Sequence, residues 1–197
     1  MANRLCAQTW VWLSLLCSSA LVPVVNGGEV ISVRVHRHAA IYDIAIEAQI
    51  EAPPQSVYAL LTDYANLSRI NPSIIESRVI EQYDEHAHRI EMITRLCVLF
   101  YCKDLKQTQD MYRGEDGLLT ARLIPHGSDF NGGSAKWQLS KRQGGTYLLF
   151  DASLEPDYWI PPLIGPLLLR HMFYREAVNT VAGLERLYKK QRDGRLE

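Results

Sequence analysis

The sequence predicts an α+β domain in which a curved antiparallel sheet of about seven strands is wrapped around one long C-terminal helix. Apolar and polar residues alternate along several stretches between residues 41 and 155, which is typical of half-buried strands. Turn-forming residues separate most of these stretches, so the connections are short and neighbouring strands are expected to be antiparallel. An apolar stripe of helical period follows near the C-terminus and can be buried against that sheet.

The N-terminal part of this domain combines one strand with two short helices. Residues 41–51 alternate, with apolar positions on one face and mostly acidic or amide positions on the other. The two prolines at 53–54 end the strand, because proline has no amide hydrogen to donate to a ladder. Residues 57–63 then predict a short helix. A second helical turn at 66–70 ends before Pro72, because the residue preceding a proline avoids helical geometry.

Six more strands are predicted after Pro72, each bounded by turn-forming residues. Their expected ranges are 73–82, 88–100, 103–113, 118–125, 134–142 and 146–155. The segment before the first strand, residues 28–39, is expected to form an N-terminal arm or an extra edge strand. The ligand-binding domain itself is expected at 40–190, followed by a polar tail at 191–197.

The long C-terminal helix is predicted at residues 167–190. Its apolar stripe consists of Leu169, Met172, Phe173, Ala177, Val181, Leu184, Leu187 and Tyr188. Its opposite face is expected to be exposed and carries Arg170, Arg175, Glu176, Asn179, Glu185, Arg186 and Lys189. The prolines at 161, 162 and 166 exclude a regular helix before it, so Trp159 is expected on a stiff loop at the mouth of the domain.

The period of two along each strand assigns side chains to the inner or the outer face of the sheet. The expected inner positions are Ile44, Ile46, Ile50, Ile75, Ser77, Val79, Ile90, Met92, Thr94, Leu96, Phe100, Leu105, Gln107, Gln109, Met111, Leu119, Ala121, Leu123, Ala135, Trp137, Leu139, Leu148, Phe150, Ala152 and Leu154. The expected outer positions carry the charges: Arg78, Arg89, Glu91, Arg95, Lys106, Asp110, Arg122, Lys136 and Asp151. None of the inner positions titrates in the range useful for acid–base catalysis, which favours a binding pocket over an active site.

Seven residues are candidates for ligand contact in such a pocket. Apolar contact is expected from Met92, Trp137, Phe150, Trp159 and Phe173, and orientation of a carbonyl or hydroxyl group from Thr94 and Gln107. The alternative is that the polar side chains satisfy one another and the aromatic side chains simply fill a core. No catalytic residue is assigned.

The first 27 residues have the pattern of a signal peptide. Arg4 supplies a short positive end, residues 9–22 are apolar, and Val25-Asn26-Gly27 offers small residues for cleavage near Gly28. A membrane anchor is the competing interpretation, but the apolar run is shorter than the ~20 residues that span a bilayer. The sequence therefore predicts export, to the periplasm.

Removal of this leader would take two of the four cysteines with it and leave Cys97 and Cys102. In an oxidising compartment an even pair favours a disulfide, here at the end of a hairpin, because residues five apart on one straight strand point to opposite faces. Two separate buried thiols are the alternative, and the sequence leaves both open. The pair supplies too few ligands for a metal, and we expect neither a metal nor a cofactor.

The overall charge argues against one class of partner. The formal net charge is -1 and the isoelectric point is near 6.6, so no basic excess is available to neutralise phosphates. We therefore expect no nucleic-acid partner. Oligomeric state is not encoded in any recognisable pattern.

Three motifs carry a resemblance to a known superfamily. They are the strand exit and helix EAPPQSVYALLTDY at 51–64, the second helical turn NLSRINP at 66–72, and the closing segment EPDYWIPPLIGP at 155–166. With the order of elements, they resemble the helix-grip proteins of the START-like (SRPBCC) superfamily, which includes polyketide cyclases and coenzyme Q-binding proteins. The resemblance extends over about residues 40–190.

The resemblance implies a protein that binds a hydrophobic small molecule, such as a lipid or a quinone, and transient membrane contact is a further expectation. Because the expected inner face lacks titratable groups, an enzyme is the less favoured interpretation. Similarity to polyketide cyclases leaves open a cyclase or dehydratase, with Tyr64 or an inward arginine supplying acid–base chemistry. A third alternative is an envelope interaction domain that docks through the charged outer face. Fold does not decide among the three.

Overall fold

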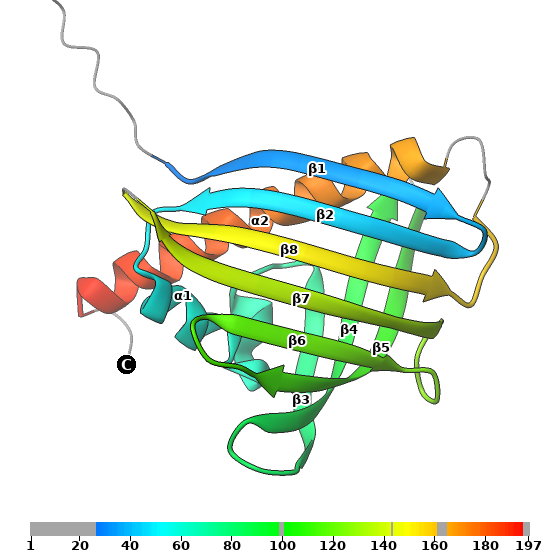
Figure 1. Ribbon diagram of the computed structural model, residues 1–197, viewed down its shortest axis with the longest axis horizontal. Coiled ribbons are helices and arrows are strands. Elements are labelled where there is room, and N and C mark those ends of the chain that lie inside the picture. The colour runs from blue at the N-terminus through cyan, green and yellow to red at the C-terminus, as the bar shows by residue number, and fades with distance from the viewer. Residues whose placement is uncertain (1–26, 99–100, 143, 161–164, 195–197) are drawn as a thin grey trace, which may run out of the picture.

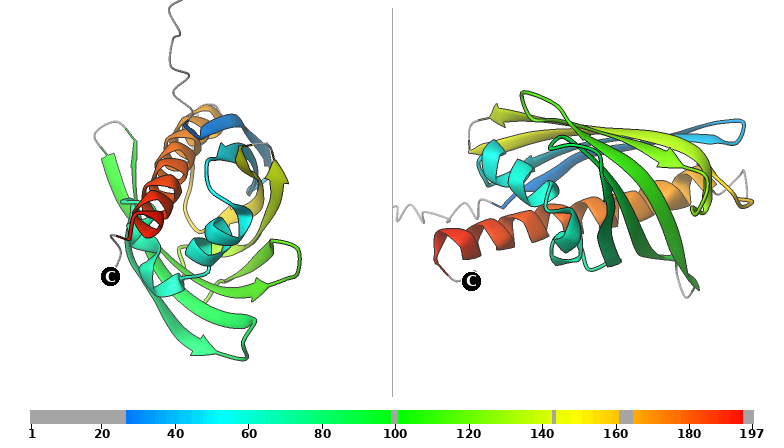
Figure 2. Two further views of the ribbon diagram at one scale, coloured as in Figure 1. Left: turned by 90° about the vertical axis from the view of Figure 1, so that its left-hand side faces the viewer. Right: turned by 90° about the horizontal axis from the view of Figure 1, so that it is seen from below.

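The computed structural model describes residues 27–98, 101–142, 144–160 and 165–194. One antiparallel sheet of eight strands curves around a long helix, and two short helices lie at one end (Figures 1 and 2). The elements are β1 (Glu29–His38), β2 (Ile41–Ile50), α1 (Pro54–Leu61), the 3-10 helix η1 (Tyr64–Arg69), β3 (Ile74–Gln82), β4 (Ala87–Val98), β5 (Tyr101–Arg113), β6 (Leu118–Ile124), β7 (Phe130–Arg142), β8 (Gly145–Pro156) and α2 (Gly165–Arg192). The predicted α+β fold with a curved antiparallel sheet and a long C-terminal helix is confirmed.

The sheet has one strand more than expected. The order across it is β1-β2-β8-β7-β6-β5-β4-β3, so β1 and β3 are the two edges. The additional strand is β1, which pairs antiparallel with β2 through Val33 opposite Ile46 and Val35 opposite Ile44. Residues 28–39 therefore contribute an edge strand, while the predicted leader, apart from Gly27, lies outside the described residues.

Two strands begin two or more residues earlier than the sequence predicts. β7 starts at Phe130 instead of 134, because Gly132 and Gly133 lie within the strand beside a register shift. A Cβ on Gly133 would lie 2.7 Å from the carbonyl oxygen of Ser153, so this glycine permits close strand contact there. β5 starts at Tyr101 instead of 103, and Cys97 lies directly opposite Cys102 across the hairpin, joined by a disulfide of 2.06 Å.

Most of the predicted inner positions are buried, but the edge strand β3 departs from the pattern. Ile75 and Val79 were expected inside and are exposed, whereas Ile74 lines the interior. A register shift between Ile74 and Glu76 changes the alternation at Ile75, and Val79 lies on an edge strand that has a neighbour on one side only. Phe100 lies outside the described residues.

The charged outer face contains one buried carboxylate. Asp110 lies on the outer face as predicted, but it is only 2% exposed, because Arg89, Arg122 and Tyr83 surround it. Arg89 donates two hydrogen bonds to it at 2.7 and 3.1 Å. These bonds, against the opposing effect of burial, lower the pKa of Asp110, so the carboxylate is held in its charged form.

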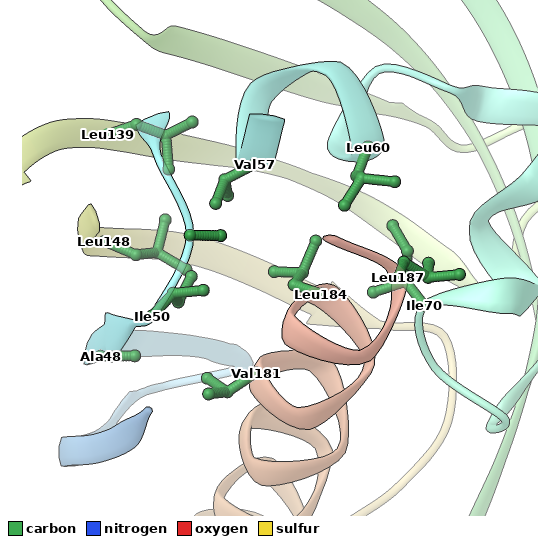
Figure 3. Packing of buried hydrophobic residues seen from close by; sticks show 11 residues of the cluster. Ala48, Ile50, Val57, Leu60, Ile70, Leu139, Leu148, Val181, Leu184 and Leu187 are labelled. Atoms are coloured by element: carbon green, nitrogen blue, oxygen red, sulfur yellow. The ribbon is translucent and has the colours of Figure 1, made fainter. Parts of the chain in front are cut away.

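The C-terminal half of α2 anchors the core of the domain. Val181, Leu184 and Leu187 pack against β2, β7, β8, α1 and the residue after η1, as Figure 3 shows for the cluster around Leu184. Gly183 makes this approach possible, because a Cβ there would lie 1.7 Å from the carbonyl oxygen of Ile70. Helix α2 and the end of η1 are therefore in backbone contact.

We predict that Gly183→Ala lowers the free energy of unfolding by about 1–3 kcal/mol, because the methyl group forces α2 away from Ile70. The sign is diagnostic, since in a helix without this contact alanine is favoured over glycine by roughly 0.5–1 kcal/mol. Urea unfolding followed by circular dichroism measures the effect. The exposed neighbour gives the control, Ala182→Ser, which should change stability by no more than about 0.5 kcal/mol. A stabilised Gly183→Ala protein would contradict this packing.

Candidate functional site

A cavity of about 280 Å³ lies between the inner face of the sheet and α2. Its wall is formed by side chains from strands β2 to β8, from α1, η1 and the two residues after η1, and from α2. Most of these side chains are apolar. The polar side chains in the wall are Asn71, Thr94, Gln107, Gln109, Glu176 and Thr180. Two other hollows lie over the outer face of β2, β6, β7 and β8 and beside the β7–β8 turn, and both are more open and more polar. The inner cavity is therefore the candidate site.

Six of the seven predicted contact residues line this cavity. They are Met92, Thr94, Gln107, Trp137, Phe150 and Phe173. Strand register brings them together: Met92 lies opposite Gln107 across β4 and β5, and Trp137 lies opposite Phe150 across β7 and β8. The rings of Trp137 and Phe150 are tilted, with centroids 5.0 Å apart. Phe173 faces them from α2.

Trp159 was expected to contact the ligand and does not line the cavity. Its side chain is 78% exposed in the segment that follows β8. The preceding residue, Tyr158, packs inward against Leu105, Leu123 and Phe130, and burial raises the pKa of Tyr158 to about 12. Because Tyr158 takes the inward position, Trp159 points to solvent. The prolines at 161 and 162 lie outside the described residues.

The Thr94 hydroxyl is a buried polar group of the cavity wall. Its hydroxyl oxygen is buried and has no hydrogen-bond partner among the described residues. A buried hydroxyl without a partner costs about 1–3 kcal/mol, which a ligand carbonyl or hydroxyl group would recover. The Thr94 hydroxyl is therefore a polar group in this mostly apolar wall that a ligand could bind.

A second polar wall was not predicted. Glu176 was expected on the exposed face of the helix, but it lines the cavity beside Phe173 and Thr180. The amide nitrogen of Asn71 donates to the carboxylate of Glu176 at 3.1 Å and to the hydroxyl of Thr180 at 3.0 Å. Residues 173, 176 and 180 are three and four positions apart, so they share one helix face, and the cavity is wide enough to reach this polar flank.

The expectation that no inner position titrates is also wrong. His88 lies opposite Met111, and Arg113 lies opposite Leu119, so both belong to the inner face. With Tyr64 of η1 they form what we call the Tyr64 cluster: the Tyr64 and His88 ring centroids are 5.5 Å apart, and the Arg113 guanidinium carbon is 5.2 Å from the Tyr64 ring. The strand period extends to 88 and 113, so the signal for this cluster was present in the sequence.

The Tyr64 cluster adjoins the cavity, because Tyr64 packs against Ile90 and Met111, which line it. Burial raises the pKa of Tyr64, with Arg113 acting in the opposite direction. Burial, and then the charge of Arg113, lower the pKa of His88, so the imidazole is neutral at pH 7. The Tyr64 hydroxyl, His88 Nδ1 and Arg113 Nε are buried without hydrogen-bond partners among the described residues. The Tyr64 hydroxyl and the Arg113 guanidinium can donate hydrogen bonds to an oxygen atom of a bound molecule, and the positive charge of Arg113 can stabilise a negative charge on it. The neutral His88 imidazole can accept a proton or a hydrogen bond.

Among the residues that the structure describes, no group of three or more His, Cys, Asp or Glu side chains is placed to hold a metal ion. No helix in these ranges is long and apolar enough to cross a membrane.

We predict that His88 makes stability depend on pH. Because the pKa of His88 is lowered in the folded protein, neutral His88 stabilises the fold fully at pH values above the pKa of about 6.5 that histidine has in the unfolded chain. This stabilisation is lost as the pH falls below that value. Between pH 7.5 and 5.5, the free energy of unfolding measured in urea should therefore fall less for His88→Gln than for the unchanged protein. His36→Gln, at an exposed histidine, should behave like the unchanged protein. An equal loss in all three would exclude a buried neutral imidazole.

Comparison with known proteins gives the family. The model described as polyketide cyclase / dehydrase and lipid transport matches residues 50–177, which is more than half of the chain. None of the curated proteins compared matches. Similar solved structures include the Zhui aromatase/cyclase of Streptomyces sp. R1128, with 12% identity, a TM-score of 0.62, and coverage of 77% of this chain and 95% of that one.

Two further solved structures are similar at comparable levels. The STAR-related lipid transfer protein of Xanthomonas axonopodis has 13% identity and a TM-score of 0.59, covering 81% of this chain and 99% of its own. A START superfamily protein of Mycobacterium smegmatis has 12% identity and a TM-score of 0.58, covering 77% and 98%. At these identities the structures support the fold alone. The match over residues 50–177 shows that the chain belongs to the polyketide cyclase / dehydrase and lipid transport family.

Proposed function

We propose that this protein is exported, to the periplasm, and binds a hydrophobic small molecule, a lipid or a quinone, in the cavity beneath α2. The observation that carries the proposal is the cavity wall: aromatic and aliphatic side chains enclose it, and the Thr94 hydroxyl is buried there without a partner. Such a wall accepts apolar surface and orients one polar group. The ligand would lie between the Trp137–Phe150 pair and Phe173.

The size of the cavity limits the ligand. At about 280 Å³ it is near the lower end of the range of roughly 300–1,000 Å³ for drug-sized ligands. It can therefore hold one compact ring system or one chain, and a larger lipid would require α2 to move outward. This favours a ligand with a single polar group over one with a bulky charged head inside the cavity.

Family and chemistry support different parts of the proposal. The family description includes lipid transport, and a similar structure is named a lipid transfer protein. Export is supported by the signal-peptide pattern and by the Cys97–Cys102 disulfide, which suits an oxidising compartment. Transient membrane contact belongs to the same proposal, because Trp159 and Leu167 are 78% and 73% exposed where the chain passes from β8 to α2.

We predict that Thr94→Val weakens ligand binding about 5- to 10-fold, which corresponds to the roughly 1–1.5 kcal/mol of one hydrogen bond. The chain beginning at Gly28 has two tryptophans, so in a Trp159→Phe background Trp137 alone reports on the cavity. Titration with a short-chain benzoquinone, which quenches a nearby indole, measures the affinity. Organic extraction and mass spectrometry of the purified protein identify any lipid it carries.

The matched control for this titration is Thr120→Val on the outer face of β6, where the side chain lines the outer hollow and not the inner cavity. It should leave quenching unchanged. Saturable quenching that is insensitive to Thr94→Val would mean that the hydroxyl does not orient the ligand. Absence of both extracted lipid and saturable quenching would refute the binding function.

A cyclase or dehydratase is the second candidate, and the Tyr64 cluster favours it. A neutral imidazole can remove a proton, the Tyr64 hydroxyl can donate one, and Arg113 can stabilise the oxyanion that forms when a carbonyl is attacked. These are the roles that an intramolecular aldol condensation of a poly-β-ketone requires. The Arg113 guanidinium is held in place by a 2.8 Å hydrogen bond to the carbonyl oxygen of Thr62.

If the protein is such an enzyme, it should convert a synthetic poly-β-keto thioester to a cyclised product that mass spectrometry detects by loss of water. His88→Gln should reduce turnover at least 100-fold, as expected for loss of an acid–base group, while quinone quenching of Trp137 is retained. His36→Gln is the control. No turnover by the unchanged protein, with binding intact, would leave the binding function alone.

A further inference from the structure

A buried carboxylate on α2 has no cation to balance it. Glu185 is only 8% exposed, and no lysine, arginine or histidine of the described residues forms an ion pair with it. Its Oε1 accepts hydrogen bonds from two backbone amides, Gly28 N at 2.8 Å and Glu51 N at 2.7 Å. Burying an ionised carboxylate without a cation is costly, and two amide donors offset only part of that cost.

Gly28 is closely packed, whereas the preceding residue, Gly27, is not. A Cβ on Gly28 would lie 2.2 Å from Oε1 of Glu185, 2.6 Å from the carbonyl oxygen of Gln49 and 2.7 Å from Val181, so only glycine fits there. Gly27 is exposed, and a Cβ on it would meet nothing within 4 Å. The boundary between open and enclosed chain therefore lies at the peptide bond that joins the two glycines, where the signal-peptide pattern also ends.

We propose that the leader is cleaved between Gly27 and Gly28 and that the α-ammonium group released on Gly28 forms a buried ion pair with Glu185. The inference rests on the proposed export. Hydrolysis adds one water across the amide bond, leaving a carboxylate on Gly27 and an ammonium on Gly28. The nitrogen that becomes charged is the atom already 2.8 Å from Oε1, so no rearrangement is needed.

This ion pair would lock three segments together. Glu185 lies on α2, Gly28 precedes β1, and Glu51 follows β2, so one carboxylate joins the helix to the start of the edge strand and to the end of its neighbour. In the uncleaved chain the same nitrogen is a neutral amide and offers a single proton. Before cleavage the Glu185 carboxylate has two neutral amide partners, and after cleavage one of these partners is a charged ammonium group. The cleaved chain is therefore the more stable form.

The test compares three chains that differ only at the N-terminus. A tag removed without residue leaves a chain beginning at Gly28 with a free ammonium group; the second chain is the same protein acetylated at that nitrogen; the third retains Gly27. Urea unfolding should give the free chain a folding equilibrium constant 10- to 100-fold larger than either of the others. Equal folding equilibrium constants for the free and acetylated chains would overturn the ion pair. This comparison involves no side-chain substitution, so its result does not depend on whether a variant folds.

Two variants distinguish a specific ion pair from a general charge effect. In Glu185→Gln the folding equilibrium constants of the free and acetylated chains should differ by no more than 2-fold, because the buried charge is gone. In Glu29→Gln, which removes an exposed carboxylate next to Gly28, the 10- to 100-fold difference should remain. An advantage that survives Glu185→Gln, or disappears in Glu29→Gln, would overturn the assignment to Glu185.

The position of cleavage is tested separately on the full chain, expressed in a bacterium that exports proteins. Intact mass and N-terminal sequencing of the periplasmic product should give a chain that begins at Gly28. A different first residue would overturn the cleavage site while leaving export intact. A product that keeps the leader and stays inside the cell would overturn export and cleavage together, while the binding function is judged independently by the quinone titration.

Discussion

A single helix has to cover the inner face of an eight-stranded sheet, and the rest of the structure depends on how this mismatch in width is met. Strands lie about 4.8 Å apart, so eight strands span roughly 34 Å when flat, whereas a helix with its side chains is about 10–12 Å across. Curvature reduces the difference, as Figure 2 shows, but does not remove it. At one end α1 and η1 supply the missing side chains and the interior is packed around Leu184. Elsewhere no further element is available, and the cavity is the space that remains.

The polar groups around that space are distributed over separate walls, and this separation makes two functions compatible with one fold. Thr94 lies on β4, and the Asn71, Glu176 and Thr180 group lies where α2 approaches the end of η1. The Tyr64 cluster lies beyond Ile90 and Met111, toward the packed end. A ligand held near Thr94 would be bound without chemistry. A ligand that also reached the Tyr64 cluster would meet proton donors, acceptors and a positive charge together.

Sequence alone was sufficient for the architecture and for most of the cavity wall, because both follow from the period of two. Met92, Thr94, Gln107, Trp137 and Phe150 lie in strand interiors, where alternation is strict. The sequence does not predict side-chain direction where a register shift interrupts the period of two or where a strand has ended. Ile75 is displaced by a register shift, and Trp159 follows the last strand, where its direction is decided by Tyr158.

Charged residues depart from the sequence prediction for a different reason. A charged side chain predicts exposure, but Asp110 is buried by Arg89 and Arg122, and Glu176 lines the cavity, where Asn71 binds it. His88 and Arg113 follow the alternation of their strands but lie near the strand ends, where the pattern is weakest. Partners distant in sequence decide whether a charged side chain is buried, and a pattern of spacing does not reveal them.

The two halves of α2 are held with unequal strength. Val181, Leu184 and Leu187 are buried beside Gly183, which contacts the backbone of Ile70. In the first half Met172 is buried, but Phe173 and Ala177 are only partly buried and Leu167, Tyr174 and Val178 are exposed. Separating the first turns from the sheet therefore exposes less apolar surface than separating the last turns. If the cavity binds a ligand as proposed, α2 would bend away from the sheet near Gly183, and the ligand would enter beneath the turns around Phe173.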